Sequence, residues 1–118
     1  MPTPTEIRLD RSAQRLIVSF DDGGRFELPL EYLRVESPSA EVKGHGPGEK
    51  RVVPGKRNVG VDRVEPVGNY AVLLVFDDGH DTGIFSWDYL HELGREQPAR
   101  WQAYLDRLAA RGLSRQSP

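Results

Sequence analysis

A five-residue pattern occurs twice in this chain, 56 residues apart, and it constrains the fold more than any other feature. The stretch Ser19–Gly23 (SFDDG) returns as Val75–Gly79 (VFDDG). Asp and Gly tolerate the positive φ angles that tight hairpin turns require. An aromatic segment follows at an offset of 57, since Leu30–Leu33 (LEYL) is echoed by Trp87–Leu90 (WDYL). The repeat predicts two related halves whose sheets pack together. The alternative is two ordinary hairpins that share a favourable turn.

Runs of β-branched and aromatic residues on both sides of these turns predict the strands. Three strands are expected before residue 29, and three more between Val61 and Ile84. Pro29 fixes φ for a helical first turn and predicts a short helix that ends at Val35. The fold class is therefore α+β, mostly antiparallel β in two hairpin-based half-repeats with C-terminal helices packed on one side.

Two helices are expected after the second hairpin. Ser86 is a good N-cap for a helix to about Leu93, with Gly94 as a left-handed stop. The last helix begins near Pro98 and ends at Gly112. Its apolar stripe is expected to dock on the sheet, and residues after 113 are expected to fray. The stripe consists of Trp101, Tyr104, Leu105 and Leu108.

Composition favours one domain over residues 1–118, with an ordered core of about 6–112, and excludes several functions. The chain has no cysteine, which excludes disulfides, thiolate zinc sites and a cysteine nucleophile. A net charge of -2 argues against nucleic acid as a partner. The longest apolar run, 70–76, is too short to span a membrane. Because the first residues carry no signal-peptide pattern, a cytoplasmic location is expected.

A long loop rich in Gly and Pro, residues 37–60, is expected between the halves. Residues 43–57 hold five cations and one glutamate, a net charge of +4 within a chain whose total is -2. Cations and exposed backbone N–H groups together can receive a phosphate or an acidic partner surface. Such charge runs are also common on solvated loop faces.

His80 is the most metal-like residue because Asp77, Asp78 and Asp81 flank it. A metal site formed by His45, His80 and Asp81 is one hypothesis. The other is a hairpin turn in which His80 hydrogen-bonds to a loop carbonyl or to Asp81. A Ser–His catalytic pair is disfavoured, since the chain has no Gly-x-Ser-x-Gly motif. Periodicity assigns most of the Trp and Tyr residues to packing.

Three segments, residues 33–46, 67–71 and 76–90, resemble the DUF971 family, also called the gamma-butyrobetaine hydroxylase-like N-terminal domain. The resemblance covers about residues 6–108. It implies a β-rich domain found in stand-alone bacterial proteins without established activity, in hydroxylases, and beside Mrp-type iron–sulfur carrier ATPases. In the hydroxylases it implies a zinc module, separate from the oxygenase domain, with three thiolates and one histidine.

By position, the zinc ligands of the hydroxylases would fall on Ser37, Ser39, Val42 and His80. Only the histidine matches, so the resemblance implies a lost zinc site and no cofactor. The oxygenase chemistry is expected to be absent as well, because it belongs to a different domain.

The function predicted from these observations is a non-catalytic binding or adaptor module. The resemblance adds iron–sulfur protein maturation as the context and an iron–sulfur carrier ATPase as the protein partner. The alternatives are the metal site above and small-metabolite or phosphate binding at the basic loop. Charge reversal at Lys56 and Arg57 is expected to weaken partner binding with thermal stability nearly unchanged. The predicted binding surface consists of Ser37, Ser39, Lys43, His45, Lys50, Arg51, Lys56, Arg57 and His80.

Overall fold

A computed structural model describes residues 2–38 and 53–116. Strands and helices follow one another in the order that the repeat predicts, with β6 extending to Ser86, two residues beyond the expected end. The elements are β1 (Pro4–Asp10), β2 (Arg15–Phe20), β3 (Arg25–Pro29), α1 (Leu30–Val35), β4 (Val61–Val67), β5 (Ala71–Phe76), β6 (Gly83–Ser86), α2 (Trp87–Arg95) and α3 (Gln97–Ala110).

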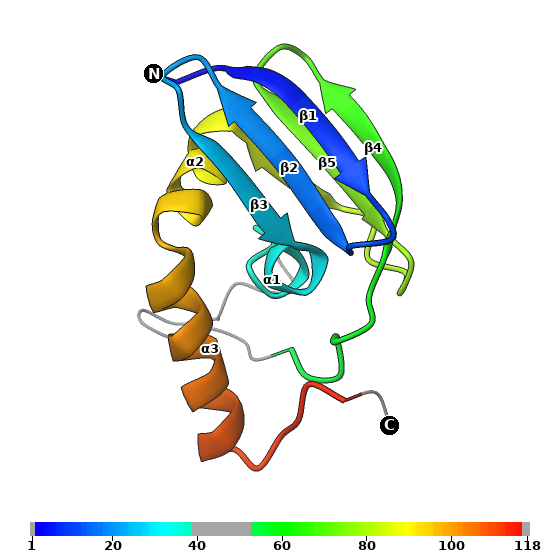
Figure 1. Cartoon of the computed structure of the whole chain (residues 1–118). Coiled ribbons are helices and arrows are strands. Elements are labelled where there is room, and N and C mark those ends of the chain that lie inside the picture. Colours follow the sequence, from blue (N-terminus) through cyan, green and yellow to red (C-terminus); the bar gives the residue numbers. More distant parts are fainter. Residues whose placement is uncertain (1, 39–52, 117–118) are drawn as a thin grey trace.

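The strands form two three-stranded antiparallel sheets, β1-β2-β3 and β4-β5-β6. Figure 1 shows the two sheets layered on each other, with α2 beside β3 and α3 extending beyond the sheets. Inward side chains of both central strands, such as Leu16 and Val18 in β2 and Val72 and Leu74 in β5, share one core cluster. The predicted α+β fold of two hairpin-based halves is confirmed.

The two halves are related by an approximate two-fold exchange of contacts. Tyr32 on α1 donates its hydroxyl hydrogen to the carbonyl of Leu93 on α2 at 2.8 Å. Tyr89, 57 residues after Tyr32, donates to the carbonyl of Glu36, 57 residues before Leu93. Each helix therefore binds the end of the other through the same interaction. The turn glycines also match, with φ of 89° at Gly23 and 91° at Gly79.

Helix α2 begins as expected but does not end at Gly94. The Ser86 hydroxyl accepts a hydrogen bond from the Tyr89 backbone N–H at 3.1 Å, which confirms the N-cap. The helix continues to Arg95, and Gly94 does not have a positive φ. A Cβ on Gly94 would collide with the ring of Phe26. This glycine therefore serves close packing between α2 and the first sheet, and its assignment as a stop was wrong.

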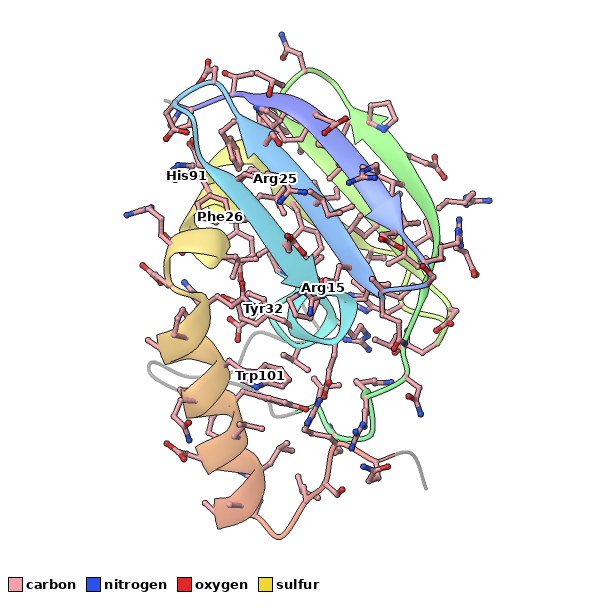
Figure 2. All side chains as sticks on the ribbon, viewed as in Figure 1. Arg15, Arg25, Phe26, Tyr32, His91 and Trp101 are labelled. Atoms are coloured by element: carbon pink, nitrogen blue, oxygen red, sulfur yellow. The ribbon has the colours of Figure 1, made fainter. Side chains whose placement is uncertain are left out.

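Helix α3 docks mainly on α1 and the segment before β4, where a sheet was expected. Tyr104 and Leu108 are buried against Val35, and the Tyr104 hydroxyl donates to the carbonyl of Val53 at 2.7 Å. Trp101 meets the Tyr32 ring edge-on, as Figure 2 shows between α1 and α3. Helix α1 is buried along its whole length, so it supplies the apolar surface that the stripe needs. None of the described helices has the length and hydropathy required to cross a bilayer.

The C-terminal segment is packed, contrary to the expected fraying. The carbonyls of Ser114 and Arg115 accept hydrogen bonds from the backbone N–H groups of Gly55 at 2.9 Å and Arg57 at 3.0 Å. The Arg115 guanidinium makes two contacts with the buried Glu31 carboxylate, at 2.9 and 2.7 Å. The segment thus joins residues 55–57 to α1, and its contact with Glu31 spans 84 positions in the chain.

Candidate functional site

His80 and Ser37 form a buried polar pair at the end of the second half. His80 follows the second Asp-Asp-Gly turn and is 3% exposed, while Ser37 follows α1 and is 1% exposed. The Ser37 Oγ lies 2.9 Å from His80 Nε2 in a hydrogen bond. Ser37 is a partner of His80 that the sequence did not predict, beside the loop carbonyl or Asp81 expected there. Gly83 leaves the room that this pair needs, because a Cβ there would lie 2.8 Å from Ser37 Oγ.

Asp78 links this pair to two cations. Its Oδ2 accepts from Arg34 Nε at 2.8 Å and from Lys56 Nζ at 2.6 Å, and its Oδ1 accepts from the His80 backbone N–H at 3.1 Å. Burial alone would raise the pKa of the Asp78 carboxyl, but the three donors outweigh it and lower the pKa to about 2. The carboxylate stays ionised at neutral pH, and two cations on one anion leave an excess positive charge.

The ion pair of Lys56 corrects one expectation from the sequence. The Lys56 side chain is only 22% exposed and contacts Asp78, so its charge contributes to the packing of the domain. Reversing that charge would place two carboxylates together. Thermal stability would therefore fall, whereas the sequence predicted that it would stay nearly unchanged. Arg57 differs, since it is exposed and its guanidinium makes no hydrogen bond or ion pair within residues 2–38 and 53–116.

The structure brings some of the predicted surface together. Ser37, Lys56 and His80 meet around Asp78, while Arg57 faces a separate cavity. Asp81 is exposed, and the part of the chain that the structure describes contains no group of three His, Asp or Glu placed to hold a metal ion. The remaining predicted residues, Ser39, Lys43, His45, Lys50 and Arg51, lie outside the described residues.

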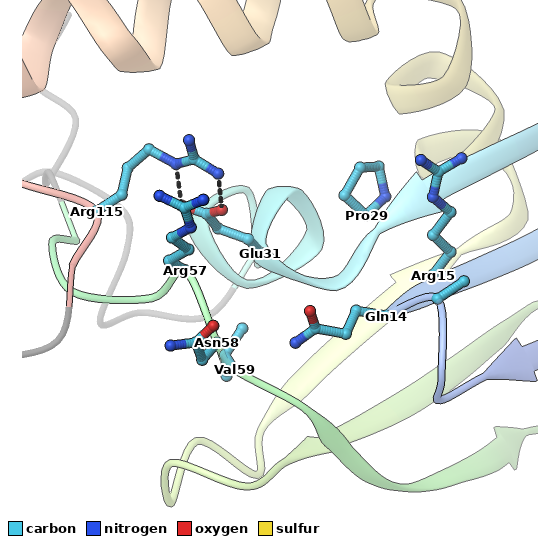
Figure 3. Close-up of a pocket in the computed structure, with 9 residues that line it drawn as sticks. Gln14, Arg15, Pro29, Glu31, Arg57, Asn58, Val59 and Arg115 are labelled. Atoms are coloured by element: carbon cyan, nitrogen blue, oxygen red, sulfur yellow. Dashed lines mark hydrogen bonds and ion pairs between the residues drawn. The ribbon is translucent and has the colours of Figure 1, made fainter.

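The cavity beside Arg57 was not predicted from the sequence. It has a volume of about 210 Å³ and lies between the β1–β2 turn, the start of α1 and the C-terminal segment (Figure 3). A second cavity of about 260 Å³ adjoins it, and Gln14 and Asn58 line both. The backbone is unusual at this cavity because Gln14 has a positive φ of 54°. The amino-acid sequence does not reveal that conformation.

Arg34 was also missed, although it lies within one of the segments that resemble DUF971. It is 8% exposed, and its Nη1 has no hydrogen-bond partner in the described part of the chain. The clue available in the sequence was the repeat itself. Asp22 and Asp78 occupy matching turns, and each needs a partner from the opposite half.

The chain has two facing three-stranded antiparallel sheets, and a helix follows the last strand of each sheet. This arrangement places it in the class of small α+β domains. The family model for the gamma-butyrobetaine hydroxylase-like N-terminal domain matches residues 7–91. The chain belongs to this family, as its resemblance to DUF971 predicted. No curated protein matches the chain.

Solved structures support the assignment. Two NMR solution structures are 46% and 50% identical to this chain, with TM-scores of 0.86 and 0.85. The first match covers 100% of this chain and 93% of the other; the second covers 99% and 87%. A crystal structure from Acidithiobacillus ferrooxidans, described as a DUF971 protein of unknown function, is 43% identical with a TM-score of 0.67. That match covers 78% of this chain and 92% of the other.

The zinc site that the resemblance implies for the hydroxylases does not fit these residues. A structural zinc site uses thiolate or imidazole ligands, whereas Ser37 offers a neutral hydroxyl. That hydroxyl is hydrogen-bonded to His80 Nε2, the nitrogen that would otherwise reach a ligand on the same side. The buried Ser37–His80 pair is a hydrogen bond within the domain and does not provide a zinc ligand set.

Proposed function

We propose that this domain is a non-catalytic binding module that docks on an acidic surface of a protein partner through the face around Arg57. The observation that carries the proposal is the state of Arg57. Its backbone N–H is held by the carbonyl of Arg115 at 3.0 Å, while its exposed guanidinium is unpaired among the described residues. An exposed guanidinium with free donors suits bidentate binding of a carboxylate.

The neighbouring cluster supports a docking role. Arg34 and Lys56 share the single carboxylate of Asp78, so positive charge is in excess next to Arg57 in the chain. Residues 43–57 add further cations in the sequence. Like charges on one face raise the association rate with an oppositely charged partner. The Ser37–His80 pair is enclosed and offers no contact to a partner, because neither side chain reaches solvent.

For the partner we propose an iron–sulfur carrier ATPase, and for the context iron–sulfur protein maturation. Both come from the family resemblance. The physical requirement that this chain places on the partner is an acidic surface, because no carboxylate in residues 2–38 and 53–116 pairs with the Arg57 guanidinium.

The experiment compares charge reversals of equal size on two faces. Arg57→Glu removes the proposed contact, and Arg63→Glu is the matched control, since the Arg63 side chain is 68% exposed and pairs with its strand neighbour Glu65. Binding of the purified ATPase from the same organism is measured by titration calorimetry at low and moderate salt. Arg57→Glu should weaken binding at least about tenfold, equivalent to about 1.4 kcal/mol. Equal affinities for the two variants would overturn the proposal.

A further inference from the structure

We infer that the groove formed by the two adjoining cavities binds the C-terminal end of an extended peptide, with the carboxylate at Arg57. The groove lies between the β1–β2 turn and residues 57–62. The inference rests on the proposed function, because it names the part of a protein partner that this face would hold.

Comparison of the halves explains why the groove is open. The Gln14 carbonyl accepts from the Leu30 backbone N–H at 2.9 Å, and the Tyr70 carbonyl accepts from Trp87 in the same way at 2.9 Å. In the second half the Trp87 indole lies across the turn, with Nε1 donating to the Asn69 carbonyl at 2.7 Å. In the first half the smaller Leu30 stands at the matching position, and the space becomes a cavity.

One end of the groove suits an anion. Arg57 and Arg115 both line the first cavity. Arg115 is fixed by Glu31 and by the Trp101 ring, 5.1 Å from its guanidinium carbon, so it forms a rigid wall. Arg57 lies beside this ion pair in Figure 3 and keeps its own charge for a ligand. A carboxylate placed there would meet the guanidinium of Arg57, and the same cavity is lined by Arg15, which shares the Glu27 carboxylate with Arg25.

The middle of the groove suits a peptide group. The carboxamides of Gln14 and Asn58 line both cavities, and neither makes a hydrogen bond to another described residue. A carboxamide offers a donor and an acceptor side by side, which matches the C=O and N–H of a peptide group. Gln14 has φ 54°, a conformation that favours Gly or Asn, and it nevertheless carries a long polar side chain at this place.

The other end suits a cation. Arg11 lines the second cavity, but its guanidinium is committed to the carbonyls of Val61 at 2.6 Å and Asp62 at 3.0 Å. The carboxylates of Asp62 and Asp77 also line it. A peptide held by its carboxylate at Arg57 would therefore favour a Lys or Arg side chain a residue or two upstream.

The volumes agree with a peptide terminus. The first cavity, about 210 Å³, is far larger than the roughly 10–15 Å³ that a single water needs, so it has room for a carboxylate and one peptide group. The adjoining 260 Å³ accepts the next residue.

The test uses the whole chain and the synthetic peptide acetyl-Ala-Lys-Ala-Gly, as the free acid and as the C-terminal amide. Affinities are measured by NMR titration for the parent and for Arg57→Gln, Gln14→Gly and Arg63→Gln. The free acid should bind at least about tenfold more tightly than the amide. Arg57→Gln and Gln14→Gly should each lose about fivefold or more, and Arg63→Gln should match the parent. The thermal midpoint of Gln14→Gly should not fall, because glycine adopts this φ freely.

Several results would overturn the inference: equal binding of acid and amide, no binding of either, or full affinity in Gln14→Gly. N-acetylglycine binding as tightly as the peptide would also overturn it, since the ligand would then be a small free carboxylate.

The inference and the proposed function can fail separately. If Arg57→Glu abolishes binding of the ATPase while the peptides do not bind, the docking face stands and the groove assignment is wrong. If the peptides bind as expected while the ATPase is indifferent to Arg57→Glu, the proposed partner is wrong and the groove stands.

Discussion

The two Asp-Asp-Gly turns hold the opposite half's helix through the same arrangement of atoms but different side chains. In the first corner, Asp22 accepts from the Gly24 N–H at 2.8 Å and contacts His91 of α2 at 2.9 Å. In the second corner, Asp78 accepts from the His80 N–H at 3.1 Å and contacts Arg34 of α1 at 2.8 Å. The second corner alone adds Lys56 to the aspartate.

The two corners also differ in the side chains that fill them. In the first, the Phe26 ring fills the space over Gly94 and meets Phe20 edge-on at 6.0 Å. In the second, the His80 imidazole meets Phe76 at 5.8 Å and bonds to Ser37. The same backbone arrangement thus holds an apolar side chain in the first corner and a hydrogen-bonded polar side chain in the second. Because a buried polar group is tolerated only when it is hydrogen-bonded, the second corner depends on the pairing of Ser37 with His80.

The largest predicted difference between the corners concerns the two aspartates. Asp78→Asn should lower the free energy of unfolding by about 3 kcal/mol, because Arg34 and Lys56 would face each other over a neutral amide. Asp22→Asn should cost clearly less, because the Asp22 side chain is 42% exposed and its partner is a histidine. Urea unfolding at pH 7 measures both values. Equal losses would show that the second corner has no special electrostatic role.

The next prediction concerns the glycine beneath Phe26. Gly94→Ala should destabilise by about 2 kcal/mol, because the new methyl group would displace the Phe26 ring. Phe26→Leu should recover part of that loss in the double variant. Additive losses in the double-mutant cycle would contradict the contact.

The second corner offers the matched control. Gly83→Ala brings a methyl group against Ser37 Oγ, and Ser37→Gly should relieve it.

Much of this fold was predictable because its signals are local. Turn chemistry fixed the hairpins, and Ser86 caps α2 as its position suggested. The prediction that Gly94 ends the helix was wrong because a glycine in a sequence is compatible with either a helix stop or a site of close packing. Only the distant Phe26 decides between the two.

The site was less predictable, since its partners lie far apart in the chain. Lys56 reaches Asp78, and Arg115 reaches Glu31 across 84 positions. A sequence shows that these residues carry charge, but their pairing depends on how the halves meet. The sequence therefore groups Lys56 with Arg57 as docking cations, whereas in the structure Lys56 pairs with Asp78 and the Arg57 guanidinium is unpaired among the described residues.

A smaller effect is expected from the two reciprocal tyrosine bonds. Tyr32→Phe and Tyr89→Phe should each cost about 1 kcal/mol, because each removes one buried hydrogen bond to a helix-end carbonyl. Burial raises the pKa of Tyr89 to about 12, so the hydroxyl keeps its proton at neutral pH. Chemical denaturation of the two variants should give similar losses. A loss confined to one variant would mean that the two hydrogen bonds have the same geometry but contribute unequally to the free energy of unfolding.

The smallest expected effect separates the corners by pH. Burial opposes the Lys56, His80 N–H and Arg34 contacts that bring the pKa of Asp78 to about 2, below 3.8 in the unfolded chain. Its contribution to stability is therefore present above about pH 4 and is lost as the pH falls toward 2. The pKa of Asp22 is also lowered, chiefly by the Gly24 N–H, so it acts in the same direction. The free energy of unfolding, measured at pH 5, 4 and 3, should fall less with decreasing pH for Asp78→Asn than for the parent. If Asp22→Asn flattens them more, the first corner dominates acid stability, and the electrostatic contrast drawn between the turns is reversed.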